Sequence, residues 1–275
     1  MLDSADSPFN TSIASLAPKE SWIEVLTMAS VPQEVVARPF NSVTGRNGLL
    51  DKYFYFFMSL LVAAIVVWGF SHSVNANLFH PAVPRPFLLW IHGAVFSGWV
   101  VFYILQSSLV RTHKVRVHRS LGWFGVALGA VMVPLGITTA IVMGRFDTYT
   151  LHQRSADDFL IVPFYDMAAF AVCLALAIYW RTKPELHRRM MLIATCGLLD
   201  AAFGRIDYVF NNSLYFLCLD AVILLGVARD LAVIRRVHKV YLIALPVLMV
   251  CQGFVVYTLR SGSHWWIRIA DRILG

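Results

Sequence analysis

Charged residues are scarce in this sequence. Only 14% of its 275 residues are Asp, Glu, Lys or Arg, whereas an ordinary soluble chain has about 25%. A soluble domain needs charge over its water-facing surface, so the shortage excludes a soluble enzyme and a disordered protein. Hydrophobic residues make up 58% of the chain, and its mean hydropathy is +0.65. This balance is typical of a multi-pass membrane protein.

The sequence also lacks paired cysteine motifs. Its four cysteines each lie singly inside an apolar stretch, which gives no support to zinc ribbons, redox dithiols or a disulfide-stapled module. We expect them to be buried thiols that act as small hydrophobic side chains. They are Cys173, Cys196, Cys218 and Cys251.

A basic stripe on a polar domain is absent too, although the net charge is +7. Nucleic acid is therefore excluded as a partner. The Lys and Arg residues instead form short runs between long apolar stretches, a pattern that indicates membrane topology.

Seven apolar stretches approach the roughly 20 residues that a spanning helix needs. Unpaired backbone groups are costly in lipid, and the stretches do not alternate in polarity, so we predict helices rather than a closed barrel. The fold class is an all-α integral membrane protein, a bundle of about seven transmembrane helices with short amphipathic helices at both ends. The predicted spans are 53–71, 87–109, 121–143, 160–180, 190–209, 213–232 and 240–259.

Three segments follow from these spans. Residues 1–50 form a cytoplasmic extension whose interfacial helix begins at a capping box from Ser21 to Glu24. Residues 51–260 are the transmembrane domain. Residues 261–275 form a second interfacial helix, in which Trp266 and Ala270 recur at helical spacing. Either terminal helix could instead dock a membrane-protein partner.

The distribution of positive charge predicts the orientation. Sixteen of the 23 Lys and Arg residues fall on the side of the N-terminus. Because cytoplasmic loops carry an excess of Lys and Arg, we expect a cytoplasmic N-terminus and an outer C-terminus in a bacterial inner membrane.

Ionisable residues inside a span are costly and therefore mark functional candidates. At a rise of about 1.5 Å per residue, His92, Asp166 and Asp220 lie about 7–10 Å below the outer edge. Arg205 and Gln252 reach a similar depth, and Asp200 lies deeper. Matched depth predicts that these groups face one another as a ligand-binding site. The predicted set is His92, Asp166, Asp200, Arg205, Asp220 and Gln252.

This site fits a bacterial inner-membrane protein that binds a small ligand, proton or cation in a transport, sensing or accessory role. One alternative is a structural ion-pair network around Arg205. Another is a metal-dependent hydrolase or haem redox protein, with His92, Asp166 and Asp220 as metal ligands. A third is a structural or assembly subunit of a larger complex. No span carries the lysine that retinal needs, and the cofactor stays open.

Each predicted cytoplasmic loop ends in a histidine followed by a cation. We expect these side chains to contact the anionic headgroups of the bilayer. They are His118, Arg119, His187, Arg188, His238 and Lys239. A metal or haem site shared by His118 and His187 is the alternative.

Three motifs carry a resemblance. They are Leu89-Trp90-Ile91-His92-Gly93, Val117-His118-Arg119-Ser120-Leu121-Gly122 and Pro184-Glu185-Leu186-His187-Arg188-Arg189-Met190. Over about residues 52–260, the chain resembles an uncharacterised family of bacterial multi-pass inner-membrane proteins with a histidine in the second span. The resemblance implies the topology and supports His92, His118 and His187 as family features, but it implies no activity.

Overall fold

The computed structural model describes residues 46–152 and 159–275. All regular secondary structure within these ranges is helical. Among the described residues, five helices are both long and apolar enough to cross a membrane. They are α2 (Arg46–Ser71), α3 (Leu88–Arg111), α4 (Val115–Arg145), α6 (Ile161–Tyr179) and α11 (Lys239–Arg260). The prediction of an all-α, multi-pass membrane protein is confirmed.

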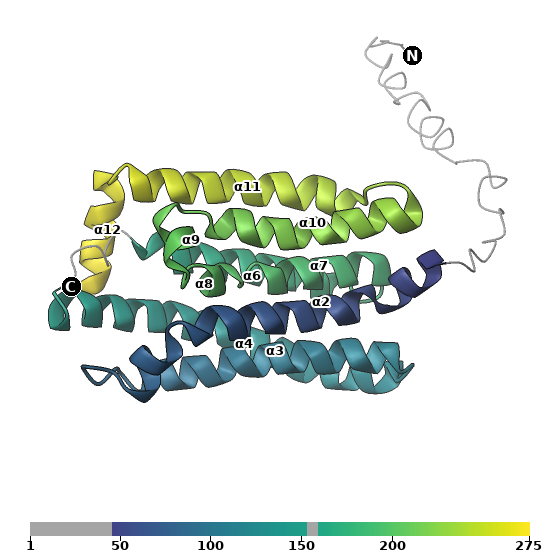
Figure 1. Ribbon diagram of the computed structural model, residues 1–275, viewed down its shortest axis with the longest axis horizontal. Coiled ribbons are helices and arrows are strands. Elements are labelled where there is room, and N and C mark those ends of the chain that lie inside the picture. The colour runs from purple at the N-terminus through teal and green to yellow at the C-terminus, as the bar shows by residue number, and fades with distance from the viewer. Residues whose placement is uncertain (1–45, 153–158) are drawn as a thin grey trace, which may run out of the picture. The chain divides into compact units, whose positions relative to one another are not determined.

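The long helices lie side by side and alternate in direction (Figure 1). The turns 112–114, 181–183 and 235–238, together with the start of α2, gather at one end, which we call the basic end. The opposite end holds the single π-helical turns η2 (Asn75–Phe79) and η3 (Phe146–Thr150). Alternation follows from the short turns at the basic end, which join each helix to an antiparallel neighbour.

The predicted span 190–209 is not one helix. It is divided into α7 (Pro184–Cys196), α8 (Asp200–Phe203) and α9 (Asp207–Asn211). Gly197 ends α7 and Gly204 ends α8, and glycine costs about 1 kcal/mol relative to alanine inside a helix. The break places Asp200 at the start of a new helical turn inside the bundle.

The predicted span 213–232 corresponds to α10 (Tyr215–Ile234). It has 20 residues but carries Asp220, Arg229 and Asp230, all of them buried. Its polar groups therefore face other helices.

The core lies between the long helices. It is built around large apolar side chains such as Trp99, Met132, Phe170 and Ile223. Other large apolar side chains, among them Val67 and Val250, are exposed, as lipid-facing positions of a bundle are. The four cysteines are free thiols. Cys173 and Cys196 are buried, Cys218 is half-buried and Cys251 is exposed.

The final helix α12 (His264–Leu274) runs across the end of the bundle opposite to the basic end (Figure 1). Arg145 Nη2 donates to the carbonyl of Ile273 at 2.9 Å, which ties α12 to the end of α4. Trp266, Ala270 and Leu274 are buried, whereas Ile269 is exposed. The other predicted interfacial helix, near Ser21, lies outside the described residues.

Candidate functional site

Two buried aspartates meet where α6 faces α8. Asp166 is 7% exposed and Asp200 is 4% exposed. The two carboxyl groups lie close enough for each to act electrostatically on the other, and Asp166 Oδ1 and Asp200 Oδ1 are buried without a hydrogen-bond partner among the described residues. Two neighbouring buried carboxyl groups do not both ionise readily, because like charges repel in a low-dielectric interior. We call Asp166 and Asp200 the acid pair.

Within residues 46–152 and 159–275, no Lys, Arg or His side chain forms an ion pair with Asp166 or Asp200. Arg205 instead donates to the carbonyl of Ala201 and lies 3.8 Å from the ring centroid of Phe70. Among the described residues Arg205 forms no ion pair, so the expected ion-pair network around it is not formed there. Its charge acts on Asp200 only over a longer distance, so the acid pair has no cation in contact.

A second acid lies on the neighbouring helices. Gln252 Nε2 donates to Asp220 Oδ1 at 3.2 Å and so joins α11 to α10. Tyr165 lies near both acid sites, close enough for the charges of Asp166 and Asp220 to act on its hydroxyl. A small cavity bordered by Tyr165 and Gln252 has room for about one water molecule. Polar groups thus continue from the acid pair toward Asp220.

His92 does not join these acids. Its ring stacks on Phe96 with centroids 4.0 Å apart, and its buried Nδ1 has no hydrogen-bond partner in the part of the chain that the structure describes. In the described part of the chain, no three His, Cys, Asp or Glu side chains gather closely enough to hold a metal ion. The predicted metal site of His92, Asp166 and Asp220 is therefore not formed. Depth along a helix is fixed by the sequence, but the direction in which each side chain points is not.

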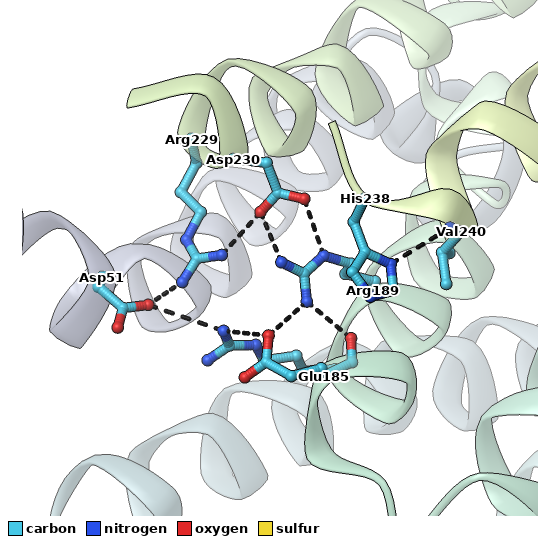
Figure 2. A network of polar contacts seen from close by, with 8 residues as sticks. Asp51, Glu185, Arg189, Arg229, Asp230, His238 and Val240 are labelled. Atoms are coloured by element: carbon cyan, nitrogen blue, oxygen red, sulfur yellow. Dashed lines mark hydrogen bonds and ion pairs between the residues drawn. The ribbon is translucent and has the colours of Figure 1, made fainter. Parts of the chain in front are cut away.

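The most extensive polar cluster lies at the basic end and was not predicted. Arg189 Nε donates to Asp230 Oδ2 at 2.9 Å, and Arg189 Nη2 donates to Asp230 Oδ1 at 2.6 Å (Figure 2). Both side chains are 0% exposed. This two-bond geometry is the strongest that an arginine and a carboxylate adopt, and it joins α7 to α10.

Further charges surround this pair. Asp230 also accepts from Arg229 at 2.7 Å, and Arg229 pairs with Asp51 on α2 (Figure 2). On the other side, Glu185 Oε2 lies 2.7 Å from both Arg188 and Arg189. Three carboxylates thus face three guanidinium groups, which balances the charge. We call these six residues the ion-pair network; they are Asp51, Glu185, Arg188, Arg189, Arg229 and Asp230.

Two titratable groups at this end have shifted pKa values. Partial burial opposes ionisation of Glu185, but hydrogen bonds from Arg189 and the charge of Arg188 outweigh it and lower its pKa below 4.5. Burial and the charge of Arg189 lower the pKa of His238 below 6.5. The neutral ring suits its position, because His238 Nδ1 accepts a hydrogen bond from the backbone N–H of Val240 at 3.2 Å and caps α11.

The residues predicted to contact headgroups all lie at the basic end. Arg119 and Lys239 are exposed. Arg188 belongs to the ion-pair network, His238 caps α11, and His187 hydrogen-bonds to the carbonyl of Ala177. Headgroup contact stays a prediction for the set.

The sequence contains one signal for the ion-pair network. Asp51, Glu185 and Asp230 are acids on a side of the bundle where positive charges gather. Acids in such surroundings indicate ion pairs. Their partners could not be identified from the sequence, because the contacts join residues as distant as Asp51 and Arg229.

No protein-family model, curated protein or solved structure matches this chain. The function is therefore argued from the geometry.

Proposed function

We propose that this membrane protein binds a proton or a small cation inside its helical bundle, at Asp166 and Asp200. The observation that carries the proposal is the pairing of two buried, neighbouring carboxyl groups, each with an unpartnered oxygen and neither in an ion pair with a described residue. Two adjacent carboxylates repel each other in a low-dielectric interior, so they need a bound proton or cation. Ionisable groups held inside a membrane bundle commonly belong to proton or ion pathways.

The surroundings of the acid pair support the exchange of a proton or cation at this site. Tyr165 and the hydrogen-bonded Asp220 and Gln252 continue the line of polar groups, and the cavity beside them accommodates about one water. The side-chain oxygens of Tyr165, Asp220 and Gln252 can accept a proton that leaves the acid pair. Transport, sensing and an accessory role all use such a site.

The proposal includes the membrane in which the protein lies and its orientation there. The chain would lie in a bacterial inner membrane, as a member of the family that its three motifs resemble. The basic end would face the cytoplasm because 16 of the 23 Lys and Arg residues belong to the predicted cytoplasmic side. Exposed Arg119 and Lys239 would then contact anionic headgroups.

Thermal stability as a function of pH and cation tests the binding site. If the folded protein keeps a proton that unfolded aspartates release, stability increases as the pH falls, by up to about 1.4 kcal/mol per pH unit. We expect Asp166→Asn to remove this increase in stability at lower pH. Sodium or lithium chloride would raise the melting temperature of the wild type if the ion replaces the proton.

The matched control is Asp207→Asn, because Asp207 is an exposed aspartate at the start of α9. N-methylglucamine chloride at equal concentration controls for ionic strength. The proposal fails if the wild type and Asp166→Asn show the same dependence on pH and on cations.

A further inference from the structure

Two histidines face each other at the basic end, away from the acid pair. His118 lies in the first turn of α4 and His187 in the first turn of α7. Their ring centroids are 6.3 Å apart and their planes cross at 76°. Ala177, which touches His187, lies about 17 Å along α6 from Asp166 at about 1.5 Å per residue. This second cluster is therefore separate from the proposed proton site.

The His187 ring is oriented by a backbone carbonyl. His187 Nδ1 lies 2.8 Å from the carbonyl oxygen of Ala177, which can only accept, so this nitrogen carries the proton. The lone pair of His187 is then on Nε2. The His118 ring lies near the backbone of Gln106 on α3. Histidines that bind metals usually donate their other ring N–H to a carbonyl or carboxylate in this way.

Buried polar atoms without partners accompany the rings. His118 Nδ1 has no hydrogen-bond partner among the described residues. The side chain of Gln106 is 8% exposed, and neither its Oε1 nor its Nε2 has a partner there. Most buried polar groups in proteins are hydrogen-bonded. Three such atoms on adjoining helices indicate that a bound group completes the site.

We infer that His118 and His187 bind one first-row transition-metal ion, of the Cu²⁺ and Zn²⁺ class. Imidazole nitrogen suits these ions, and Cu²⁺ binds most strongly in the series. With metal–nitrogen bonds of about 2 Å, two rings on opposite sides of one ion have centroids about 6 Å apart. The Gln106 amide oxygen and water supply the remaining ligands.

The surrounding charges permit a cation here. Arg188 and Arg189 follow His187 in the sequence, but both are paired with carboxylates of the ion-pair network. Their positive charge is therefore balanced. Arg119 is exposed, and its charge is the weakest of the influences on the His118 ring.

Metal uptake by the full-length protein tests the inference. The purified protein in lipid nanodiscs is stripped with a chelator, loaded with CuCl₂ or ZnCl₂ and analysed for metal per chain. We expect stoichiometric uptake by the wild type and by His113→Ala, because His113 is an exposed histidine of the neighbouring turn. His118→Ala and His187→Ala should each weaken binding at least tenfold. Gln106→Leu should weaken it about tenfold, in the range typical of supporting residues.

Two further measurements keep the result decisive if an alanine variant folds poorly. The electron paramagnetic resonance spectrum of the Cu²⁺-loaded wild type should show coupling to the nitrogens of two imidazoles. Asp166→Asn should retain the metal, which separates this site from the proposed proton site. The inference is overturned if the wild type takes up no stoichiometric metal, if the Cu²⁺ spectrum lacks imidazole coupling, or if His113→Ala loses as much metal as His118→Ala.

Discussion

Arg189 shows how a single residue can join two helices in a membrane bundle. Its guanidinium is fully buried, and both bonds to Asp230 are charge-assisted. Taking such a pair out of water is costly, so its formation adds little net stability. Removing Arg189 is a different matter, because the buried Asp230 loses both of these bonds and keeps only Arg229 as a partner.

We therefore expect Arg189→Met to destabilise the protein by about 3–5 kcal/mol. Arg235→Met is the control, because Arg235 is exposed in the turn after α10, and should have little effect. The double variant Arg189→Met with Asp230→Leu should recover part of the loss, since no unpaired charge is left. Reversible unfolding in mixed micelles measures all three. Equal losses in Arg189→Met and Arg235→Met would contradict the account.

His238 should make stability depend on pH below neutrality. Its pKa is lowered in the folded protein, so the unfolded chain takes up the proton first as the pH falls through 6.5. The stability contributed by the neutral ring is full above 6.5 and is lost as the pH falls toward the folded value. Glu185 acts with the same sign below 4.5, because its pKa is also lowered.

The variant His238→Asn isolates the contribution of His238 to the pH dependence of stability. Asparagine is a good N-cap residue that does not titrate near neutral pH, so the variant should keep the cap of α11 and lose the acid-induced decrease that begins near pH 6.5. Melting temperature against pH measures it. The acid pair acts in the opposite direction, so Asp166→Asn and His238→Asn should change the profile with opposite signs. An unchanged profile in His238→Asn would contradict the assignment.

At the scale of helices, close approach depends on small residues. Gly69 on α2 is buried, and a Cβ at this position would overlap the backbone carbonyl of Ala202 on α8. Backbone atoms cannot move aside as a flexible side chain can. Gly253 on α11 has open space where its Cβ would lie.

Gly69→Ala should therefore destabilise the bundle by about 1–3 kcal/mol, the usual cost of overpacking. Gly253→Ala is the matched control and should be neutral or stabilising by up to about 1 kcal/mol, because alanine favours the helix. Thermal unfolding of both variants in the same detergent compares them. The packing of α2 on α8 would be in doubt if Gly69→Ala were as stable as Gly253→Ala.

Hydropathy was enough to predict the long helices, because continuous apolar stretches of this length have few other structures. The division of 190–209 was harder to predict, since Gly197 and Gly204 are weak signals and glycine is common in membrane helices. Depth identified Asp166 and Asp200 as candidates. Their contact, and that of Asp220 with Gln252, depends on how each helix is rotated. One sequence does not give that rotation.

Across the whole molecule, the few charges are used in different ways at different depths. At the basic end, the ion-pair network balances three carboxylates with three guanidinium groups. Inside the bundle, Asp166 and Asp200 lie beside each other and form no ion pair with any residue that the structure describes, since Arg205 lies over Phe70 instead. The few charged residues of this chain therefore include one carboxyl pair, Asp166 and Asp200, whose presence helix packing alone does not explain.

Infrared spectroscopy of the protein in lipid tests this central claim most directly. A protonated carboxylic acid has a carbonyl-stretching band that an ionised carboxylate lacks. We expect such a band in the wild type at neutral pH, shifted by labelling aspartate with carbon-13, absent in the Asp166→Asn, Asp200→Asn double variant and unchanged in Asp207→Asn. Displacement of the band by sodium or lithium would identify a cation as the exchanging ligand. A wild-type spectrum without a protonated aspartate band at neutral pH, with no effect of either cation on stability, would contradict the account.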